Sequence, residues 1–178
     1  MNPIRTVDNF LTKDEMKMLE EYFDDHVWRW GHRSHPKVKK NSPISKWFYV
    51  IFDDKPYFTE YLKEKIESIT GMEFELCRVY ANGQTISNDG DWHRDVIDDE
   101  KNDVFVTAIL YVSDITLDNV DEVRGYTYFR LLNDDIVTIE PIKNRLVLFD
   151  SRVSHRGCAP SIPGFLRISL AWKLKRIK

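Results

Sequence analysis

The sequence has few cysteines and lacks a long apolar run. Its two cysteines, Cys77 and Cys158, have no CxxC spacing, which favours reduced thiols over a disulfide framework. No apolar stretch approaches the roughly 20 residues that span a bilayer, and the first residues lack the apolar core of a signal peptide. These absences predict a cytoplasmic protein without a membrane segment.

The sequence also lacks an excess of charge of one sign. The net charge is −3 with 31% charged residues, so the composition indicates neither nucleic acid nor a membrane as a partner. Apolar residues, in contrast, make up 42% of the chain and aromatic residues 13%. This content, over residues 1–178, predicts one domain with a proper hydrophobic core.

The first part of the chain, to about residue 72, has helical patterns. Thr12 followed three residues later by Glu15 is a capping-box pattern, and the apolar residues after it recur at helical spacing. A second helix is predicted from Pro56, which suits a first helical turn, to Gly71.

Between these helices, segment 28–40 combines Trp28 and Trp30 with basic residues, and a strand is predicted after it at 46–52. The segment predicts a loop or hairpin arm. Two interpretations of this arm remain open: a mobile lid, or a surface for an acidic partner or nucleic acid. Three histidines without a carboxylate at chelating spacing are interpreted as loop residues: His26, His32 and His35.

From residue 73 to about 174 the sequence consists of short β-branched and aromatic segments bounded by Gly, Pro, Asn or Asp. The predicted strands are 73–81, 104–112, 125–132, 136–140, 145–149 and 165–174. Helices followed by a run of antiparallel strands predict a mostly β, α+β fold. We expect a double-stranded β-helix, that is, a jelly-roll barrel, with the helices packed on one face.

A metal-binding pattern stands between the predicted strands. His93 and Asp95 are two residues apart, so on an extended chain both side chains point to the same side. His155 follows the strand 145–149 and can approach from a neighbouring strand. Two imidazoles and one carboxylate form the facial triad of non-haem Fe(II) oxygenases, which leaves positions open for a chelating cosubstrate and O₂.

The C-terminal strand adds an anion-binding pattern. Arg167 and Ser169 share one face by alternation, and together they offer a bidentate carboxylate clamp with an extra donor. On the strand 104–112, Thr107 and Tyr111 share a face with apolar side chains. This lining suits a five-carbon diacid with one end on the metal.

In this order, these motifs resemble the prolyl-4-hydroxylase-like branch of the 2-oxoglutarate/Fe(II)-dependent dioxygenase superfamily. The matching segments are RVYANG (78–83), WHRD (92–95), VTAILYVSD (106–114), GYTYF (125–129), PIKNRLVLFDSRVSHRG (141–157) and LRISLAW (166–172). The resemblance covers about residues 73–174. Two positions depart from the family pattern: Tyr126 replaces a second glycine, and Asn144 stands in a turn where Gly is common, although Asn tolerates positive φ.

The resemblance implies three iron ligands: His93, Asp95 and His155. It implies that Arg167 binds the distal carboxylate of 2-oxoglutarate with support from Tyr111. It also implies that Thr107 lines the pocket and that Tyr80 lies beside the cosubstrate or substrate. The implied cofactors are Fe(II), 2-oxoglutarate and O₂, with ascorbate as a candidate reductant.

The implied activity is C–H hydroxylation coupled to oxidative decarboxylation of 2-oxoglutarate, with a peptidyl prolyl residue as the favoured substrate. The same chemistry on a free amino acid, small metabolite or modified nucleobase is one alternative. Lys173 stands where nucleic-acid demethylases usually have a second Arg, which disfavours the nucleobase. A non-catalytic, cupin-like metal-binding barrel is the other alternative. Substrate choice is expected to depend on loops 28–45, 82–92 and 114–124.

Overall fold

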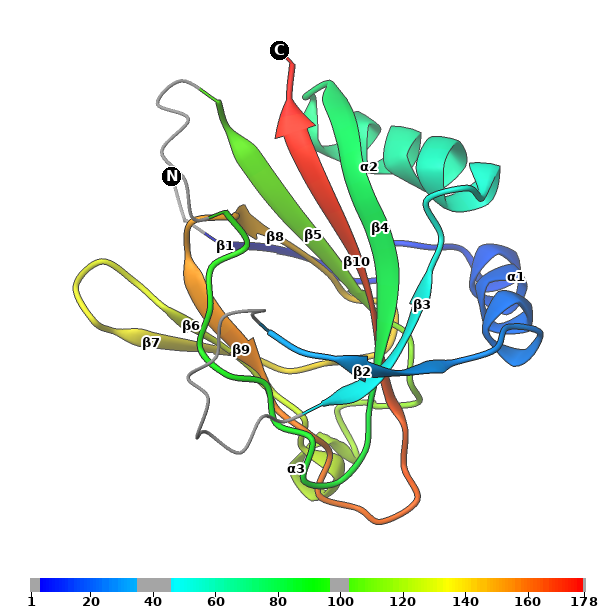
Figure 1. Ribbon diagram of the computed structural model, residues 1–178, viewed down its shortest axis with the longest axis vertical. Coiled ribbons are helices and arrows are strands. Elements are labelled where there is room, and N and C mark those ends of the chain that lie inside the picture. The colour runs from blue at the N-terminus through cyan, green and yellow to red at the C-terminus, as the bar shows by residue number, and fades with distance from the viewer. Residues whose placement is uncertain (1–3, 35–45, 97–102, 178) are drawn as a thin grey trace.

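The computed structural model describes residues 4–34, 46–96 and 103–177. Within these residues the chain forms a seven-stranded and a three-stranded antiparallel sheet, with two longer helices packed at one side (Figure 1). The architecture is mostly β, in the arrangement of a double-stranded β-helix, so the predicted fold class is confirmed. Residues 35–45 lie outside the described residues; they include part of the basic arm (28–40) and His35, which was interpreted as a loop residue.

The larger sheet forms one wall of the barrel. Its order is β1 (Ile4–Val7), β8 (Leu146–Asp150), β5 (Phe105–Tyr111), β10 (Arg167–Arg176), β4 (Phe74–Gln84), β3 (Trp47–Ile51) and β2 (Arg29–His32). The smaller sheet has the order β7 (Ile136–Ile139), β6 (Thr127–Arg130) and β9 (Ser154–Gly157). Strand β10 pairs with β4 on one side and β5 on the other, so its side chains lie in the middle of the larger sheet.

Both predicted helices are present. Helix α1 (Lys13–Asp24) begins with the predicted capping box: the Thr12 side chain accepts from the backbone N–H of Glu15, whose carboxylate accepts from the Thr12 N–H at 2.6 Å. The second helical segment starts as a π-helical turn, η1 (Tyr57–Tyr61), and continues as α2 (Leu62–Thr70). Gly71 ends α2 at φ 67°, a conformation that glycine adopts without strain.

The main core lies between these helices and the outer face of the larger sheet. Alternation along β10 turns Leu170, Trp172 and Leu174 toward the helices, and all three are fully buried. The indole N–H of Trp172 donates to the Phe58 carbonyl at 2.9 Å, which satisfies its polar atom. Burial of each such side chain stabilises the fold by roughly 1.5–3 kcal/mol. The opposite face of β10 is left for the functional site.

Three short elements had no signal in the sequence: β1, β9 and α3 (Val120–Val123). Each has four residues, too few for a periodic pattern to develop. Strands β6 and β7 are equally short, but they lie within the longer predicted segments 125–132 and 136–140. Strand β1 is held by non-local pairing with β8, where Ile4 lies opposite Phe149. Strand β2 pairs with β3, so the described residues of the arm form part of a hairpin, one of the two forms expected.

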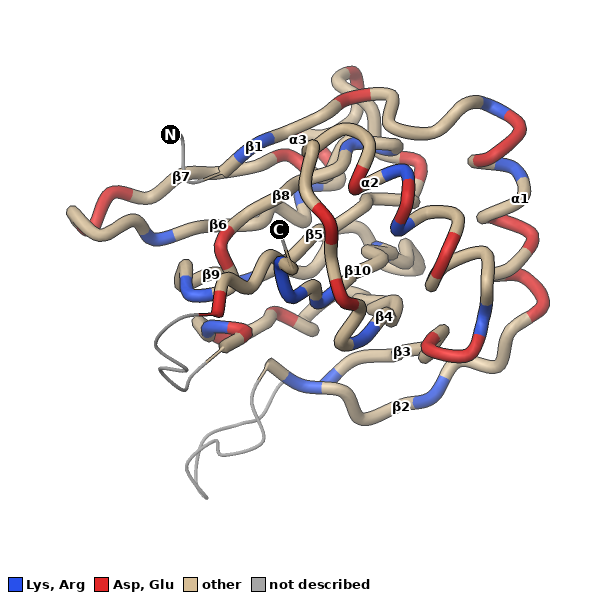
Figure 2. Tube along the Cα trace, turned by 90° about the horizontal axis from the view of Figure 1, so that it is seen from above, with Lys and Arg blue, Asp and Glu red and all other residues tan. Residues whose placement is uncertain are grey.

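Figure 2 shows acidic and basic residues interspersed along the described chain, in agreement with the small net charge. Among the helices of the described residues, we find none with the length and apolar character required to cross a bilayer.

Candidate active site

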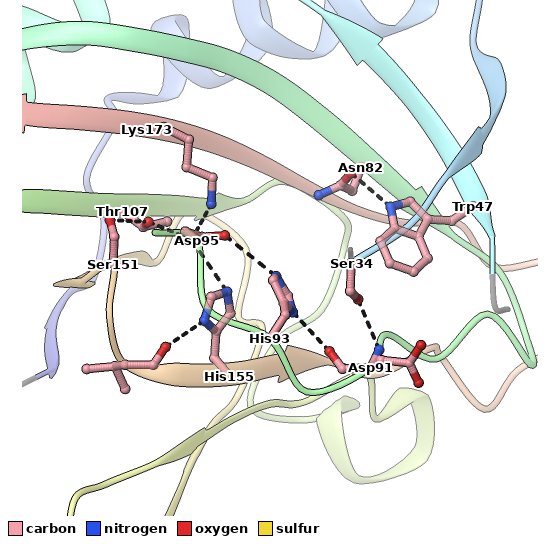
Figure 3. A network of polar contacts seen from close by, with 11 residues as sticks. Ser34, Trp47, Asn82, Asp91, His93, Asp95, Thr107, Ser151, His155 and Lys173 are labelled. Carbon is pink, nitrogen blue, oxygen red and sulfur yellow. Dashed lines mark hydrogen bonds and ion pairs between the residues drawn. The ribbon is translucent and has the colours of Figure 1, made fainter. Parts of the chain in front are cut away.

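The HxD segment is fixed to strand β9 by backbone hydrogen bonds. His93 and His155 exchange both of their N–H···O bonds, at 3.0 and 2.9 Å, and the Asp95 N–H donates to the Ser151 carbonyl at 2.9 Å. This pairing brings three potential metal-ligand atoms, one from each side chain of His93, Asp95 and His155, within 4.8 Å of one another (Figure 3). The structure therefore brings the predicted triad together.

A backbone carbonyl fixes the orientation of each imidazole ring. Nδ1 of His93 lies 2.9 Å from the Asp91 carbonyl, and Nδ1 of His155 lies 3.0 Å from the Val153 carbonyl. A carbonyl oxygen only accepts hydrogen bonds, so each Nδ1 carries the proton. The Nε2 lone pair of each ring is then free for a metal ion, the usual arrangement of metal-binding histidines.

Asp95 is held by two neighbouring strands. Its Oδ2 accepts from Thr107 Oγ1 at 2.6 Å and from the Lys173 ammonium, while Oδ1 faces His93. Thr107 and Lys173 are register partners across β5 and β10, so the two donors converge on one oxygen. This arrangement leaves Oδ1 as the oxygen available to a metal.

The charges of the triad suit a divalent cation. Burial would raise the pKa of Asp95, but Lys173 and the two histidines outweigh it and hold this pKa well below its usual value. Burial lowers the pKa of His155 to about 3. At neutral pH Asp95 is therefore a carboxylate and His155 is neutral, the forms that bind metals.

Arg167 lies at the other end of the site with an uncompensated charge. The residue is 2% exposed. Its guanidinium donates to three neutral oxygens: Gly125 O at 2.6 Å, Gln84 Oε1 at 2.9 Å and Thr127 Oγ1 at 3.0 Å. Within residues 4–34, 46–96 and 103–177, no carboxylate forms an ion pair with it. A buried cation of this kind is costly unless an anion binds it.

A cavity of about 90 Å³ joins Arg167 to the triad. Ser169 and Tyr80 line it, as do Gln84 and Thr127, which bond Arg167. Two imidazoles and a carboxylate stand at one end, and an unpaired guanidinium stands at the other. The residues present therefore fit a divalent metal ion together with a small dicarboxylate.

Two predicted site residues, Tyr111 and Thr107, do not line the cavity themselves. The Tyr111 hydroxyl donates to Thr127 Oγ1 at 2.7 Å, and the Arg167 guanidinium lies 5.3 Å from the Tyr111 ring centroid. Thr107 bonds Asp95, as described above. Neither is among the residues that line the cavity, so each reaches it through another side chain. A direct contact of either residue with a cosubstrate stays a prediction.

The two departures from the family pattern are accommodated without blocking the cavity. Tyr126 does not line it, and its hydroxyl donates to Asp121 at 3.2 Å. Asn144 has φ 64°, as expected for a residue that replaces glycine in the turn. Its side chain also bonds the backbone N–H and carbonyl of Leu11, at 2.8 and 2.7 Å.

Three residues of the site were not predicted. Lys173 continues the alternation of Arg167 and Ser169 along β10, so the sequence contained a signal for its position. Gln84 faces Arg167 only because β4 and β10 pair in this register. His32 was interpreted as a loop residue, but it lies in β2 and lines the cavity, so that interpretation is corrected.

Comparisons with known proteins agree with this geometry. The sequence profile of the 2OG-Fe(II) oxygenase superfamily matches residues 77–172, which include the triad and Arg167. No curated protein has a significantly similar sequence.

Solved structures share the fold at low identity. A Trichoplax adhaerens prolyl hydroxylase, in complex with a hypoxia inducible factor peptide fragment, has 16% identity and a TM-score of 0.71, over 98% of this chain and 84% of that chain. A Pseudomonas putida prolyl-4-hydroxylase has 17% identity and a TM-score of 0.69, over 99% and 94%. Streptomyces hygroscopicus HygX, with nickel, 2-oxoglutarate and hygromycin B bound, has 11% identity and a TM-score of 0.68, over 97% and 82%.

Proposed function

The chain belongs to the 2OG-Fe(II) oxygenase superfamily, and on this premise we propose that it is a hydroxylase with one iron and one 2-oxoglutarate site. The proposed iron ligands are His93, Asp95 and His155. Arg167 is proposed to anchor the distal carboxylate of 2-oxoglutarate. One observation carries this assignment: a buried guanidinium without a carboxylate partner in the described chain faces the triad across a cavity.

Fe(II) with 2-oxoglutarate and O₂ supplies the oxidising power for C–H hydroxylation, with succinate and CO₂ as co-products. The chain's own residues position these groups. Arg167 and Ser169 bind the far carboxylate, while Thr107 and Lys173 fix the orientation of Asp95. Burial of His155 and Arg167 limits the access of water to the groups that they bind.

For the substrate we propose a prolyl residue in a peptide. Two of the structures with this fold are prolyl hydroxylases, and one of them holds a peptide fragment. A small molecule is the second candidate, because HygX has the same fold and holds hygromycin B. A nucleobase is disfavoured by Lys173, whose ammonium is committed to Asp95. A non-catalytic barrel would have no use for the buried Arg167.

The proposed chemistry is tested by anaerobic addition of Fe(II) and 2-oxoglutarate. We expect a weak visible charge-transfer band in the wild type and its loss in His93→Ala and His155→Ala, because each removes one imidazole ligand. The same variants should lose 2-oxoglutarate turnover, measured as succinate release. His26→Ala is the matched control, since His26 bonds the Tyr22 carbonyl away from the cavity. A band that persists in both triad variants would reject the ligand assignment.

The substrate is tested separately. Proline-containing peptides, free amino acids and small metabolites are screened for stimulated succinate release. The product is then examined by mass spectrometry for the gain of one oxygen atom. Peptide hydroxylation at a residue other than proline, or stimulation by small molecules alone, would reject the prolyl assignment while leaving the iron and 2-oxoglutarate sites intact.

A further inference from the structure

A β-bulge in strand β2 turns His32 into the cavity. Trp30 lies opposite Phe48, but His32, not Gly31, lies opposite Trp47, so one extra residue is inserted at Gly31. Gly31 has φ 121°, a conformation that other residues rarely adopt. In a regular strand Trp30 and His32 would share a face, whereas the bulge places them on opposite faces. Trp30 is accordingly 54% exposed, and His32 lines the cavity.

His32 stands among aromatic rings with one nitrogen unsatisfied. Its ring centroid lies 5.1 Å from Tyr80, 5.3 Å from Tyr49 and 5.8 Å from Trp47. Trp47 is itself fixed, because its indole N–H donates to Asn82 at 2.9 Å (Figure 3). Nδ1 of His32 is buried and has no hydrogen-bond partner in the described part of the chain. A buried polar atom without a partner is unfavourable unless a ligand supplies one.

The surroundings of His32 are positively charged. Arg33 lines the same cavity. Arg78 is the register partner of Lys173, so it projects from the same sheet face, and its guanidinium lies 4.9 Å from the Tyr80 ring centroid. Neither arginine has an ion-pair partner among the residues that the structure describes.

No other charged side chain among the described residues that line the cavity neutralises Arg33 and Arg78. Asp95 is the one carboxylate among the lining residues, and Lys173 already neutralises it. Burial, together with the charges of Arg78 and Lys173, lowers the pKa of His32 to about 4 against a hydrogen bond with Asn82 that raises it. This side of the site therefore favours a negatively charged group and disfavours a cationic one.

We propose that His32 and Arg33, with Arg78 beside the cavity, form a substrate subsite on its β2–β3 side, and that this subsite binds a free carboxylate of the substrate, which in a prolyl peptide is the carboxylate of a C-terminal proline. Nδ1 of His32 donates to the carboxylate in its Nδ1–H tautomer. The two guanidinium groups complement the charge, and the rings of Tyr80 and Trp47 pack against the adjoining apolar part. The proposal deepens the function proposed above and rests on it, because the carboxylate belongs to the molecule that is hydroxylated.

The test compares N-acetyl-L-proline with N-acetyl-L-prolinamide, two probes that differ only in the carboxylate. Their affinities are measured by ligand-observed NMR on the protein loaded with Zn(II) and 2-oxoglutarate, which does not turn over. We expect the acid to bind about tenfold more tightly, as for one charge-assisted hydrogen bond. His32→Phe should abolish this preference while keeping an aromatic ring. His26→Phe, outside the cavity, should retain it.

A second variant keeps the test decisive if His32→Phe folds poorly. Arg78 is exposed, so Arg78→Gln should fold normally and reduce the preference for the acid severalfold. Equal affinities in the wild type, binding of neither probe, or a preference that survives in both variants would overturn the subsite.

The wild-type Fe(II)–2-oxoglutarate band reports on the proposed function independently of the probes. Its absence rejects that function whatever the two affinities are. Its presence together with equal affinities rejects only the carboxylate subsite.

Discussion

Gly125 and Arg167 are in such close contact that a single methyl group should disturb the anion site. Gly125 has φ 78°, and a Cβ there would lie 2.8 Å from Cδ of Arg167. Gly125→Ala is therefore expected to displace the guanidinium and raise the KM for 2-oxoglutarate about tenfold or more. The strained backbone should also lower the free energy of unfolding by about 1 kcal/mol. Initial rates over a 2-oxoglutarate series and urea unfolding measure the two effects.

Gly164 provides the matched control. Its φ of 79° is nearly the same, but a Cβ there would meet nothing within 4 Å. Gly164→Ala should show the same loss of stability without a change in KM. A similar rise in KM for both variants would mean that backbone strain, not the contact with Arg167, limits 2-oxoglutarate binding.

At the residue scale, the sequence predicted positions that depend on one strand alone. Arg167 and Ser169 follow from alternation along β10, and the cavity has both on its wall. Gln84 and His32 could not be predicted. Gln84 contacts Arg167 through the register between β4 and β10, and His32 reaches the cavity through a bulge. Neither pairing leaves a local pattern in the sequence.

Helices α1 and α2 are joined by a buried carboxylate. Glu15 accepts hydrogen bonds from Lys65 at 2.5 and 2.7 Å, from Tyr61 at 2.5 Å and from the Thr12 N–H. Burial raises the pKa of Glu15, but the bonds from Lys65 and Tyr61 outweigh it and lower the pKa to about 2. The folded state thus favours the ionised form of Glu15.

This shift in the pKa of Glu15 predicts how the free energy of unfolding depends on pH. The contribution of Glu15 to the free energy of unfolding should be complete above pH 4.5, near the pKa of Glu15 in the unfolded chain. It should be lost as the pH falls toward about 2, the pKa of Glu15 in the folded state. Glu15→Gln should lower the free energy of unfolding by roughly 2 kcal/mol at neutral pH, and its difference from the wild type should shrink below pH 4.5. Urea unfolding at several pH values measures both. Asp14→Asn, an exposed change in the same helical turn, should show neither effect.

At the element scale, the residues that begin and end the helices were predicted more reliably than the short strands. Thr12 and Gly71 marked the start of α1 and the end of α2, because capping and positive φ are local chemistry. The longer strands were found near their observed bounds. The four-residue strands β1, β2 and β9 are held by hydrogen bonds to distant partners, which no sequence window contains.

At the scale of the whole molecule, the site exists only after both sheets have formed. His155 comes from β9 in the smaller sheet, Arg167 from β10 in the larger one, and the HxD segment bridges them. The order of the motifs along the chain indicated this convergence. The distances and the placement of Lys173 depended on the closed barrel.

Because the site spans both sheets, its ligands should stabilise the whole fold. A ligand at 100 times its Kd adds about 2.7 kcal/mol to the free energy of unfolding, which raises the Tm of a domain of this size by about 5–11 °C. We expect one increment with Mn(II) and a second with added 2-oxoglutarate, measured by calorimetry after chelator treatment. His93→Ala should lose both rises in Tm, since the keto-acid end of 2-oxoglutarate needs the metal. Arg167→Lys should keep the metal increment and lose most of the second, because an ammonium lacks the bidentate geometry. A full second increment in Arg167→Lys would place the 2-oxoglutarate carboxylate elsewhere.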